Sequence, residues 1–138
     1  MAAAHFGLVR SMEQLYDELS RRFPEIQERL EIDRDLPYCL MNTLADWLAA
    51  RSPQEFTLGV INRIVAFSRW CEEQPRGKDA RIDLATIFTV GLLEKLFEHE
   101  STRFLLPKLI TKAQMREGAD YMKAHVGVDN YEKALRYF

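Results

Sequence analysis

The sequence lacks an excess of positive charge, because 19 Lys and Arg residues stand against 21 Asp and Glu residues and leave a formal net charge of −2. Proteins that bind nucleic acids through the phosphates usually carry a clear basic surplus. The composition therefore argues against DNA or RNA as a partner. In other respects it is that of an ordinary globular domain, with 47% hydrophobic and 29% charged residues.

Long uninterrupted apolar segments and targeting signals are also missing. The first ten residues have no positively charged start, and their apolar stretch is too short and too broken for a signal peptide. The most apolar segment, residues 82–97, is interrupted by Glu94 and Lys95 before it reaches the length of a membrane span. We therefore expect a cytoplasmic protein that has no membrane partner.

Cysteine is scarce, with two residues, Cys39 and Cys71. Both fall at helical positions beside apolar neighbours. In a protein that is not exported, such cysteines are small buried hydrophobic residues more often than disulfide partners.

Strand patterns are absent as well: no segment alternates polar and apolar residues, and no Asn-Gly or Asp-Gly turn joins two apolar runs. Apolar residues recur at helical spacing instead. We predict a single all-α domain over residues 1–138, an irregular compact bundle of about seven or eight helices around a buried central helix. Residues 1–10 are expected to be flexible or loosely packed. A helical-repeat-like stack is the alternative, although no self-similar period is found.

Helix start and stop signals divide the chain into these elements. The first half is expected to contain a helix over 12–22 after a capping box at Ser11, an acidic helix opened by Pro24, a helix from Pro37 to about Arg51, and a long helix opened by the capping box Ser52–Glu55. The second half is expected to contain a loop over 74–79, the central helix over 82–97, a short element over 104–110, a helix from Thr111 to Gly127, and a last helix from about Asp129.

The segment from Ile82 to Phe97 has almost no polar face, whereas the other predicted helices are amphipathic. A helix that is apolar all round is buried on all sides. We therefore expect the core to contain residues of this segment and of its neighbours, namely Leu84, Ile87, Phe88, Leu92, Leu93 and Leu96 with Trp47, Ile61, Ile64 and Phe67.

Residues that usually ligate metals do not occur at ligand spacing. His5, His99 and His125 are isolated from one another and form no His-Glu-x-x-His or Cys-x-x-Cys pattern. Glu98, His99 and Glu100 are adjacent, and adjacent helical residues point in different directions. We expect a solvated helix end there, and neither a metal nor a cofactor. His125 lies close to a helix carboxyl terminus, where the helix dipole favours its protonated form.

Nucleophile motifs are likewise missing. Ser11, Ser52 and Thr111 are explained as helix caps, and neither a Gly-x-Ser-x-Gly elbow nor a glycine-rich phosphate loop is present. We therefore predict that the protein is not an enzyme.

Acidic residues are concentrated near the amino terminus. Residues 11–35 hold eight acids and four bases, a net charge of −4, so that the rest of the chain carries +2. Within this stretch the acids expected to share a helix surface, or to extend it, are Glu25, Glu28, Glu31, Asp33 and Asp35. A basic cleft on a partner would complement this face. The alternative is a solvated face with local ion pairs such as Glu25 to Arg29.

The core motif Phe88-Thr-Val-Gly-Leu-Leu-Glu-Lys-Leu-Phe97 follows a helix containing Ile64-Val-Ala-Phe-Ser-Arg-Trp70 and precedes Phe104-Leu-Leu-Pro-Lys-Leu. Over roughly residues 40–125 the chain resembles a poorly characterised group of small all-helical bacterial proteins that share a Val-Gly-hydrophobic-Leu-Glu core helix. Some of these are suspected to be immunity proteins, the cytoplasmic antidotes of bacterial toxins. The resemblance implies no particular binding residues.

The resemblance thus implies a protein that neutralises a cognate bacterial toxin by binding and occluding it, without catalysis. Two alternatives remain open. One is a helical adaptor or regulatory subunit, and the other is a small enzyme whose site is assembled from distant residues. The sequence leaves the toxin and the oligomeric state undetermined.

Overall fold

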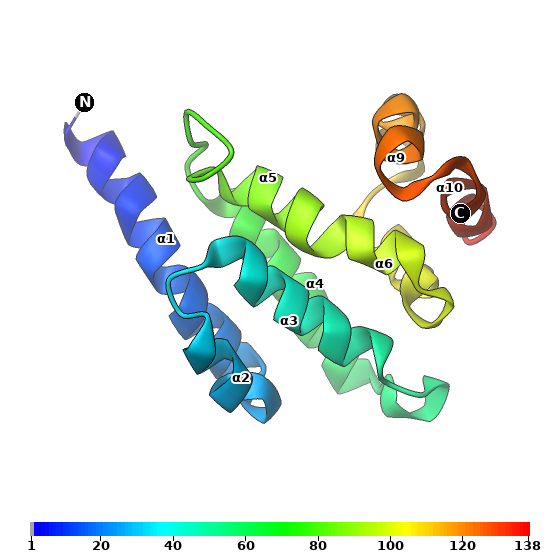
Figure 1. Cartoon of the computed structure of the whole chain (residues 1–138), viewed down its shortest axis with the longest axis horizontal. Coiled ribbons are helices and arrows are strands. Elements are labelled where there is room, and N and C mark those ends of the chain that lie inside the picture. The colour runs from blue at the N-terminus through cyan, green and yellow to red at the C-terminus, as the bar shows by residue number, and fades with distance from the viewer. Residues whose placement is uncertain (1) are drawn as a thin grey trace.

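The computed structural model describes the backbone of residues 2–138 and the side chains from Met12 onward. Within this range the protein is all-α and has no strand. Its helices are α1 (Ala2–Arg22), α2 (Gln27–Ile32), α3 (Pro37–Ala49), α4 (Leu58–Glu73), α5 (Leu84–Phe88), α6 (Glu94–Glu98), α7 (Leu106–Leu109), α8 (Lys112–Glu117), α9 (Ala119–Val126) and α10 (Val128–Leu135) (Figure 1). The shorter turns are the 3-10 helices η1 (Pro24–Ile26), η2 (Pro53–Glu55) and η4 (Glu100–Leu105) and the π-helical turn η3 (Thr89–Leu93).

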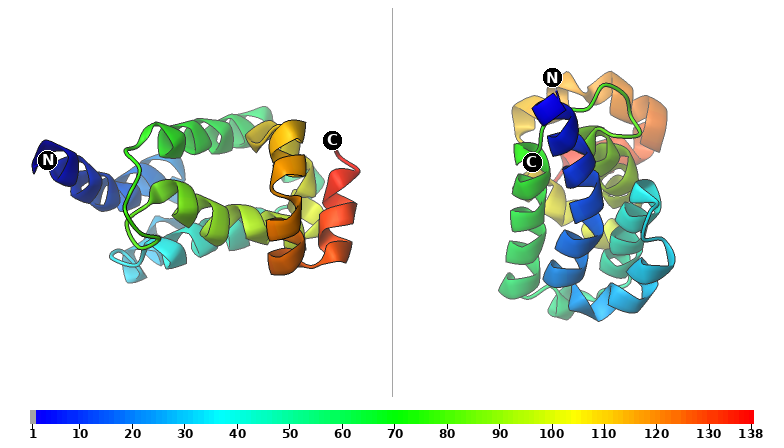
Figure 2. Two further views of the ribbon diagram at one scale, coloured as in Figure 1. Left: turned by 90° about the horizontal axis from the view of Figure 1, so that it is seen from above. Right: turned by 90° about the vertical axis from the view of Figure 1, so that its left-hand side faces the viewer.

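The helices α5 and α6 continue one another through η3 and form one rod in the middle of the bundle (Figure 1). Helix α3 contacts this rod at η3, and α4 contacts it at α5. Helices α9 and α10 lie across one end of the bundle, where both contact α6 (Figure 2). The prediction of an irregular all-α bundle around a buried central helix is therefore confirmed.

The predicted core is confirmed with one exception. All the expected residues of the central segment are buried, as are Trp47, Ile64 and Phe67. Ile61 is only half-buried. It packs against the edge of the core and keeps part of its side chain in solvent.

Helix α1 begins at Ala2, so the prediction of a helix start near residue 12 was wrong. Ser11 lies inside the helix and does not cap it. The run Ala2–Ala4 consists of the strongest helix former, which allows the helix to continue past the local capping pattern. Residues 1–10 were expected to be flexible or loosely packed. Met1 and the side chains of residues 2–10 lie outside the described residues.

The capping box at Ser52 forms, but it opens only η2. The backbone leaves the helical region at Phe56, and the ring of this residue packs edge-on against Phe104 at a centroid distance of 4.9 Å. The long helix then starts at Leu58, where the hydroxyl of Thr57 accepts a hydrogen bond from the Val60 amide. The predicted capping box is therefore confirmed, whereas the prediction that it opens the long helix was wrong.

The central rod is not a regular α-helix, because five residues form the π-helical turn η3. Gly91 in this turn faces α3. A Cβ atom added to Gly91 would lie 2.6 Å from the Cβ of Met41, which is closer than two carbon atoms can approach. Glycine is therefore required for the contact between α3 and the rod.

The predicted helix from Thr111 to Gly127 starts and ends as expected but is divided into α8 and α9 at Gly118. Thr111 and Gln114 form the predicted reciprocal capping box, with N–H···O distances of 2.8 and 3.1 Å. Gly127 adopts a φ of 91°, which L-residues with a side chain rarely adopt, and so permits the sharp turn into α10.

Cys39 and Cys71 are both free thiols, as predicted. Cys71 is buried, and its burial raises the pKa of its thiol strongly, whereas Cys39 is only half-buried. Across the described residues, none of the helices combines the length and the apolar character that crossing a membrane requires.

Candidate partner-binding surfaces

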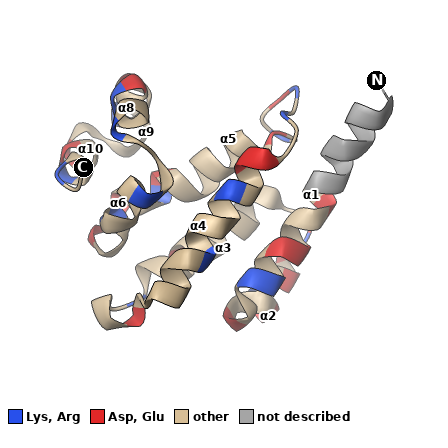
Figure 3. Cartoon of the chain, turned by 180° about the vertical axis from the view of Figure 1, so that it is seen from behind, with Lys and Arg blue, Asp and Glu red and all other residues tan. Residues whose placement is uncertain are grey.

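The five acidic residues predicted to bind a partner lie on η1, on α2 and in the turn that leads into α3. Glu25, Glu28, Glu31 and Asp35 are exposed, and Asp33 is half-buried. Seen from behind in Figure 3, acidic residues mark α1 and α2 at the side of the bundle opposite α9 and α10. The structure gives these five carboxylates different surroundings.

Glu25 is held by a residue from a distant helix. Arg63 of α4 donates two hydrogen bonds to its carboxylate, each at 2.8 Å, and a third at 2.9 Å to the carbonyl of Arg22. The pairing with Arg63 lowers the pKa of Glu25. This ion pair joins η1 to α4, whereas the alternative considered from the sequence paired Glu25 with Arg29.

Glu31 is also engaged within the fold. Its carboxylate accepts a hydrogen bond from the hydroxyl of Tyr16 on α1, and Arg34 lies 3.4 Å from its other oxygen. The bond from Tyr16 lowers the pKa of Glu31. The guanidinium of Arg34 in turn lies over the Tyr16 ring, 4.4 Å from its centroid. Glu31 therefore helps to fix α2 against α1.

The remaining acids surround two exposed apolar side chains. Glu28, Asp33 and Asp35 form no side-chain hydrogen bond or ion pair with any residue whose side chain is described. Between them Ile32 is 82% exposed and Leu36 is 53% exposed. We call these five residues the α2–α3 corner. Ile32 and Leu36 were not predicted from the sequence, although both fall outside the apolar stripe that carries the buried residues of α2.

A hollow of about 340 Å³ adjoins the α2–α3 corner and extends its acidic surface onto α1. It is lined by Met12, Glu13, Asp17, Arg34, Asp35 and Pro37. Three of these are carboxylates and one is a cation. The hollow would therefore accept a basic side chain more readily than an acidic one.

A second group of polar side chains joins α6 to α9. Glu94 is a buried carboxylate; it accepts a hydrogen bond from the hydroxyl of Tyr121 at 3.0 Å and lies 3.4 Å from Nδ1 of His125. The rings of Tyr121 and His125 stack at 4.0 Å. Burial, and then the bond to Glu94, raises the pKa of Tyr121 to about 12. His125 was predicted to lie at a helix end, and its contact with Glu94 was not predicted from the sequence.

Beside Tyr121 lies a hollow of about 360 Å³ whose hydroxyl groups are already in use. Thr86 donates to Asp83 at 2.6 Å, and Thr89 donates to the carbonyl of Ala85 at 2.9 Å. A nucleophilic hydroxyl needs a base that takes up its proton. Here both threonine hydroxyls are held by hydrogen bonds within their own helical turn.

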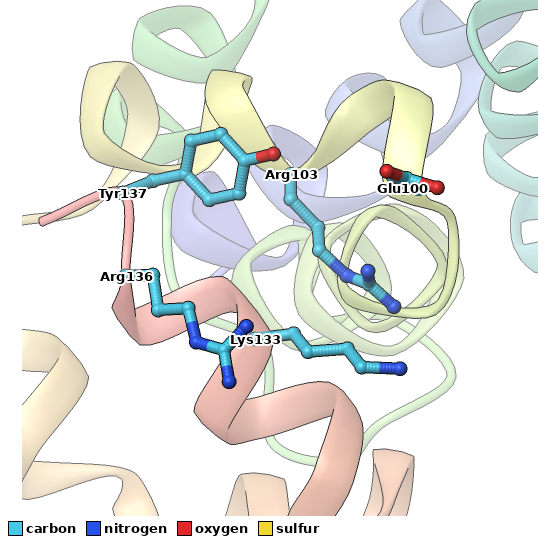
Figure 4. Close-up of a pocket in the computed structure, with 5 residues that line it drawn as sticks. All are labelled: Glu100, Arg103, Lys133, Arg136 and Tyr137. Carbon is cyan, nitrogen blue, oxygen red and sulfur yellow. The ribbon is translucent and has the colours of Figure 1, made fainter.

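A cationic cavity of about 350 Å³ lies between η4 and the end of α10 (Figure 4). It is lined by Glu100, Arg103, Lys133, Arg136 and Tyr137. Arg103 is 7% exposed and extends from η4, whereas Lys133 and Arg136 come from the α10 side. Glu100 was predicted from the sequence to lie at a solvated helix end, and no cavity was predicted there.

A wider and more apolar groove continues from this cavity, with a volume of about 700 Å³. It shares Glu100 and Tyr137 with the cationic cavity, and its other lining residues are Pro53, Phe56, His99, Ser101 and Phe104. His99 is thus exposed at the rim of a groove, next to Glu100.

Metal ligands are not gathered anywhere in the part of the chain with described side chains: no three His, Cys, Asp or Glu residues lie close enough to hold an ion. His5 falls outside that part. Comparisons of the chain with protein-family models, with curated proteins and with solved structures find no match.

Proposed function

We propose that the protein acts by binding a basic protein partner at the α2–α3 corner, without turnover. The observation that carries this proposal is the exposure of Ile32, 82% of whose surface is in solvent, among carboxylates that are not neutralised by described side chains. An exposed apolar side chain of this size favours burial by a partner. The adjacent carboxylates select a partner whose contact surface carries Lys and Arg.

The two kinds of side chain have separate roles in this proposal. Ile32 and Leu36 supply affinity, because apolar anchors that become buried contribute most of the binding free energy at an interface. Glu28 and Asp35 supply orientation and rate, because surface charges steer the encounter and have little effect on lifetime. The acidic hollow beside Asp35 extends the attraction onto α1.

More specifically, we propose that the basic partner is a bacterial toxin and that this protein is its immunity-type antidote. The support is the resemblance of the core motif Phe88–Phe97 and the acidic character of the corner. A toxin that acts on nucleic acid or nucleotides has a basic cleft, which an acidic helical surface blocks. A helical adaptor or regulatory subunit would use the same corner for a different basic protein.

Binding without turnover is also supported by the polar groups outside the corner. Glu94 is buried, and its contacts with Tyr121 and His125 join α6 to α9, which gives these polar groups a structural role. The enzyme alternative would require at least one of them to be unengaged and to face a substrate-sized cavity.

The test is survival of cells that express a candidate toxin, chosen from a gene next to the one for this chain, together with either the parent chain or a variant. The double variant Ile32→Ser, Leu36→Ser removes both apolar anchors. Leu58→Ser is the matched control, because Leu58 is 73% exposed and lies on α4 away from the corner. We expect the parent and the control to protect and the double variant to lose protection while its thermal unfolding stays unchanged.

Two results would contradict the proposal. Full protection by the double variant would exclude the α2–α3 corner as the binding surface. Death of cells that express the folded parent chain beside this toxin would exclude the immunity role against it.

A further inference from the structure

We propose that the cationic cavity and the apolar groove together bind a small apolar carboxylate, independently of the α2–α3 corner. The site lies at η4 and α10, at the other end of the molecule from α2 (Figure 1). The ligand would place its carboxylate against Arg103 and Arg136 and its apolar body over Phe56 and Phe104.

Arg103 is the centre of this site because it is a buried cation without an acidic partner. Its Nε donates to the carbonyl of Phe97 at 2.9 Å, and its Nη2 donates to Oδ1 of Asn130 at 2.8 Å. Both acceptors are uncharged. Among the described side chains, no carboxylate forms a close ion pair with Arg103, and Asp129, whose pKa Arg103 helps to lower, acts on it only at longer range. Burying a charge without a close counter-ion is costly.

The two hydrogen bonds also fix the direction of the guanidinium. Nε donates its single N–H and Nη2 one of its two to the protein, so Nη1 and the second N–H of Nη2 are left as donors that the cavity can use. A side chain held in this way loses little conformational entropy on binding. Figure 4 shows Arg103 entering the cavity from η4, with Lys133 and Arg136 reaching it from α10.

The balance of charges selects an ion with a single negative charge. Arg103, Lys133 and Arg136 are opposed by Glu100 on the rim, and Lys133 is also paired with Asp129 at 2.9 Å. When both carboxylates are counted, one positive charge remains. A carboxylate neutralises this surplus, whereas a phosphate dianion would overcompensate it.

The adjoining groove selects the rest of the ligand. Phe56 and Phe104 form its apolar surface and contact one another edge-on, and Tyr137, which is 46% exposed, stands where the groove meets the cavity. A volume of about 700 Å³ is in the range of small-molecule sites. The class of ligand is therefore an aryl or alkyl carboxylate.

The experiment titrates the full chain, labelled with ¹⁵N, with hydrocinnamate and follows the backbone amide signals. Acetate supplies the charge without the apolar body, hydrocinnamyl alcohol supplies the apolar body without the charge, and phenyl phosphate supplies a dianion. We expect saturable shifts confined to the amides around Arg103, Phe104 and Tyr137, at millimolar concentrations for hydrocinnamate and at clearly higher ones for the other three compounds.

Two variants should then move the affinity in opposite directions. Arg136→Gln removes a donor and should weaken hydrocinnamate binding about tenfold. Glu100→Gln removes the repelling charge and should strengthen binding about two- to threefold. Both side chains are exposed, so neither change threatens folding. Arg116→Gln on α8 is the matched control, and it should leave the affinity unchanged.

Several outcomes would overturn the proposal. Equal affinity for hydrocinnamate and its alcohol would show that the cations play no part. Tighter binding of phenyl phosphate than of hydrocinnamate would show that the site prefers a phosphate to a carboxylate. Absence of saturable shifts with hydrocinnamate, or equal weakening by Arg136→Gln and Arg116→Gln, would reject the site.

Discussion

Arg76 and Asp83 form a two-pronged ion pair that closes the loop between α4 and α5. Nε of Arg76 lies 2.8 Å from Oδ1 of Asp83, and Nη2 lies 2.9 Å from Oδ2. The same carboxylate accepts bonds from the amides of Gly77 and Thr86, so it also caps the first turn of the central rod. Asp83 is buried although its partner is largely exposed.

These bonds make the contribution of Asp83 dependent on pH. The guanidinium of Arg76, followed by Thr86 and Gly77, holds the pKa of this carboxyl far below its usual value of 3.8. A carboxyl with a lowered pKa in the folded state stabilises the fold above its unfolded pKa. That contribution is lost as the pH falls from about 4 through the lowered folded pKa.

We therefore expect Asp83→Asn to lower the free energy of unfolding by about 1 to 2 kcal/mol at neutral pH, because a helix cap and a charged bond are lost. The difference from the parent should narrow below pH of about 3. Urea unfolding measured across this pH range checks both expectations. Asp79→Asn in the same loop is the control, because Asp79 pairs only with the exposed Arg81. A difference in unfolding free energy between Asp83→Asn and the parent that does not change with pH would contradict this role of the Asp83 carboxylate.

The contact between Gly91 and Met41 leads to a second prediction. Gly91→Ala places a methyl group 2.6 Å from the Met41 Cβ and should cost about 1 to 3 kcal/mol, as overpacking of a core does. A methyl group at Gly59 on α4 would meet only Oγ1 of Thr57, at an ordinary contact distance of 3.7 Å, so Gly59→Ala should be neutral or stabilising by up to about 1 kcal/mol. Chemical unfolding of both variants measures the contrast. Equal effects would show that the rod and α3 are not in close contact.

The local signals in the sequence identified most helices correctly because caps and apolar spacing act within a few residues. The capping box at Thr111 and the apolar face of α3 are examples. The π-helical turn was not predictable in this way, because it depends on Gly91 meeting a residue of another helix. The start of α4 was misplaced for a similar reason: Phe56 leaves the helix to reach Phe104.

A site could be predicted from the sequence only where its residues lie close together along the chain. The acidic stretch was visible as composition, but Arg63 is 38 residues from Glu25 and no local pattern connects them. The cationic cavity needs Arg103 and Arg136 to meet from two elements, which only the fold determines. A signal for the contacts between α6 and α9 was present in Glu94, a buried carboxylate inside a mainly apolar segment.

The cluster around Glu94 should be observable by titration of tyrosine absorbance. Tyr121 is expected to lose its proton near pH 12, above its usual value of 10, because burial and the adjacent carboxylate both disfavour the phenolate. Any stability that this gives is present below pH 10 and is lost as the pH rises from 10 through 12. Glu94→Gln keeps the shape without the charge and should move the titration back toward 10. A tyrosine titration that is the same in Glu94→Gln as in the parent would contradict the contact between Tyr121 and Glu94.

A last prediction separates the acids of the α2–α3 corner from those that hold the fold. Glu31→Lys breaks the bond from Tyr16 and places a cation beside Arg34, so we expect its melting temperature to fall. Glu28→Lys changes a carboxylate without a described partner and should melt like the parent. With a basic partner, Glu28→Lys should slow association, most clearly at low salt, where screening is weak.

Thermal unfolding and the association rate at two salt concentrations, measured on both variants, decide this prediction. A lower melting temperature for Glu28→Lys would reveal a structural role for Glu28. A parent-like association rate for Glu28→Lys at low salt would remove this charge from the docking surface, and the binding proposal would then depend on the apolar side chains of Ile32 and Leu36 alone. The salt dependence is informative because the burial of Ile32 is nearly insensitive to ionic strength, whereas steering by Glu28 is not.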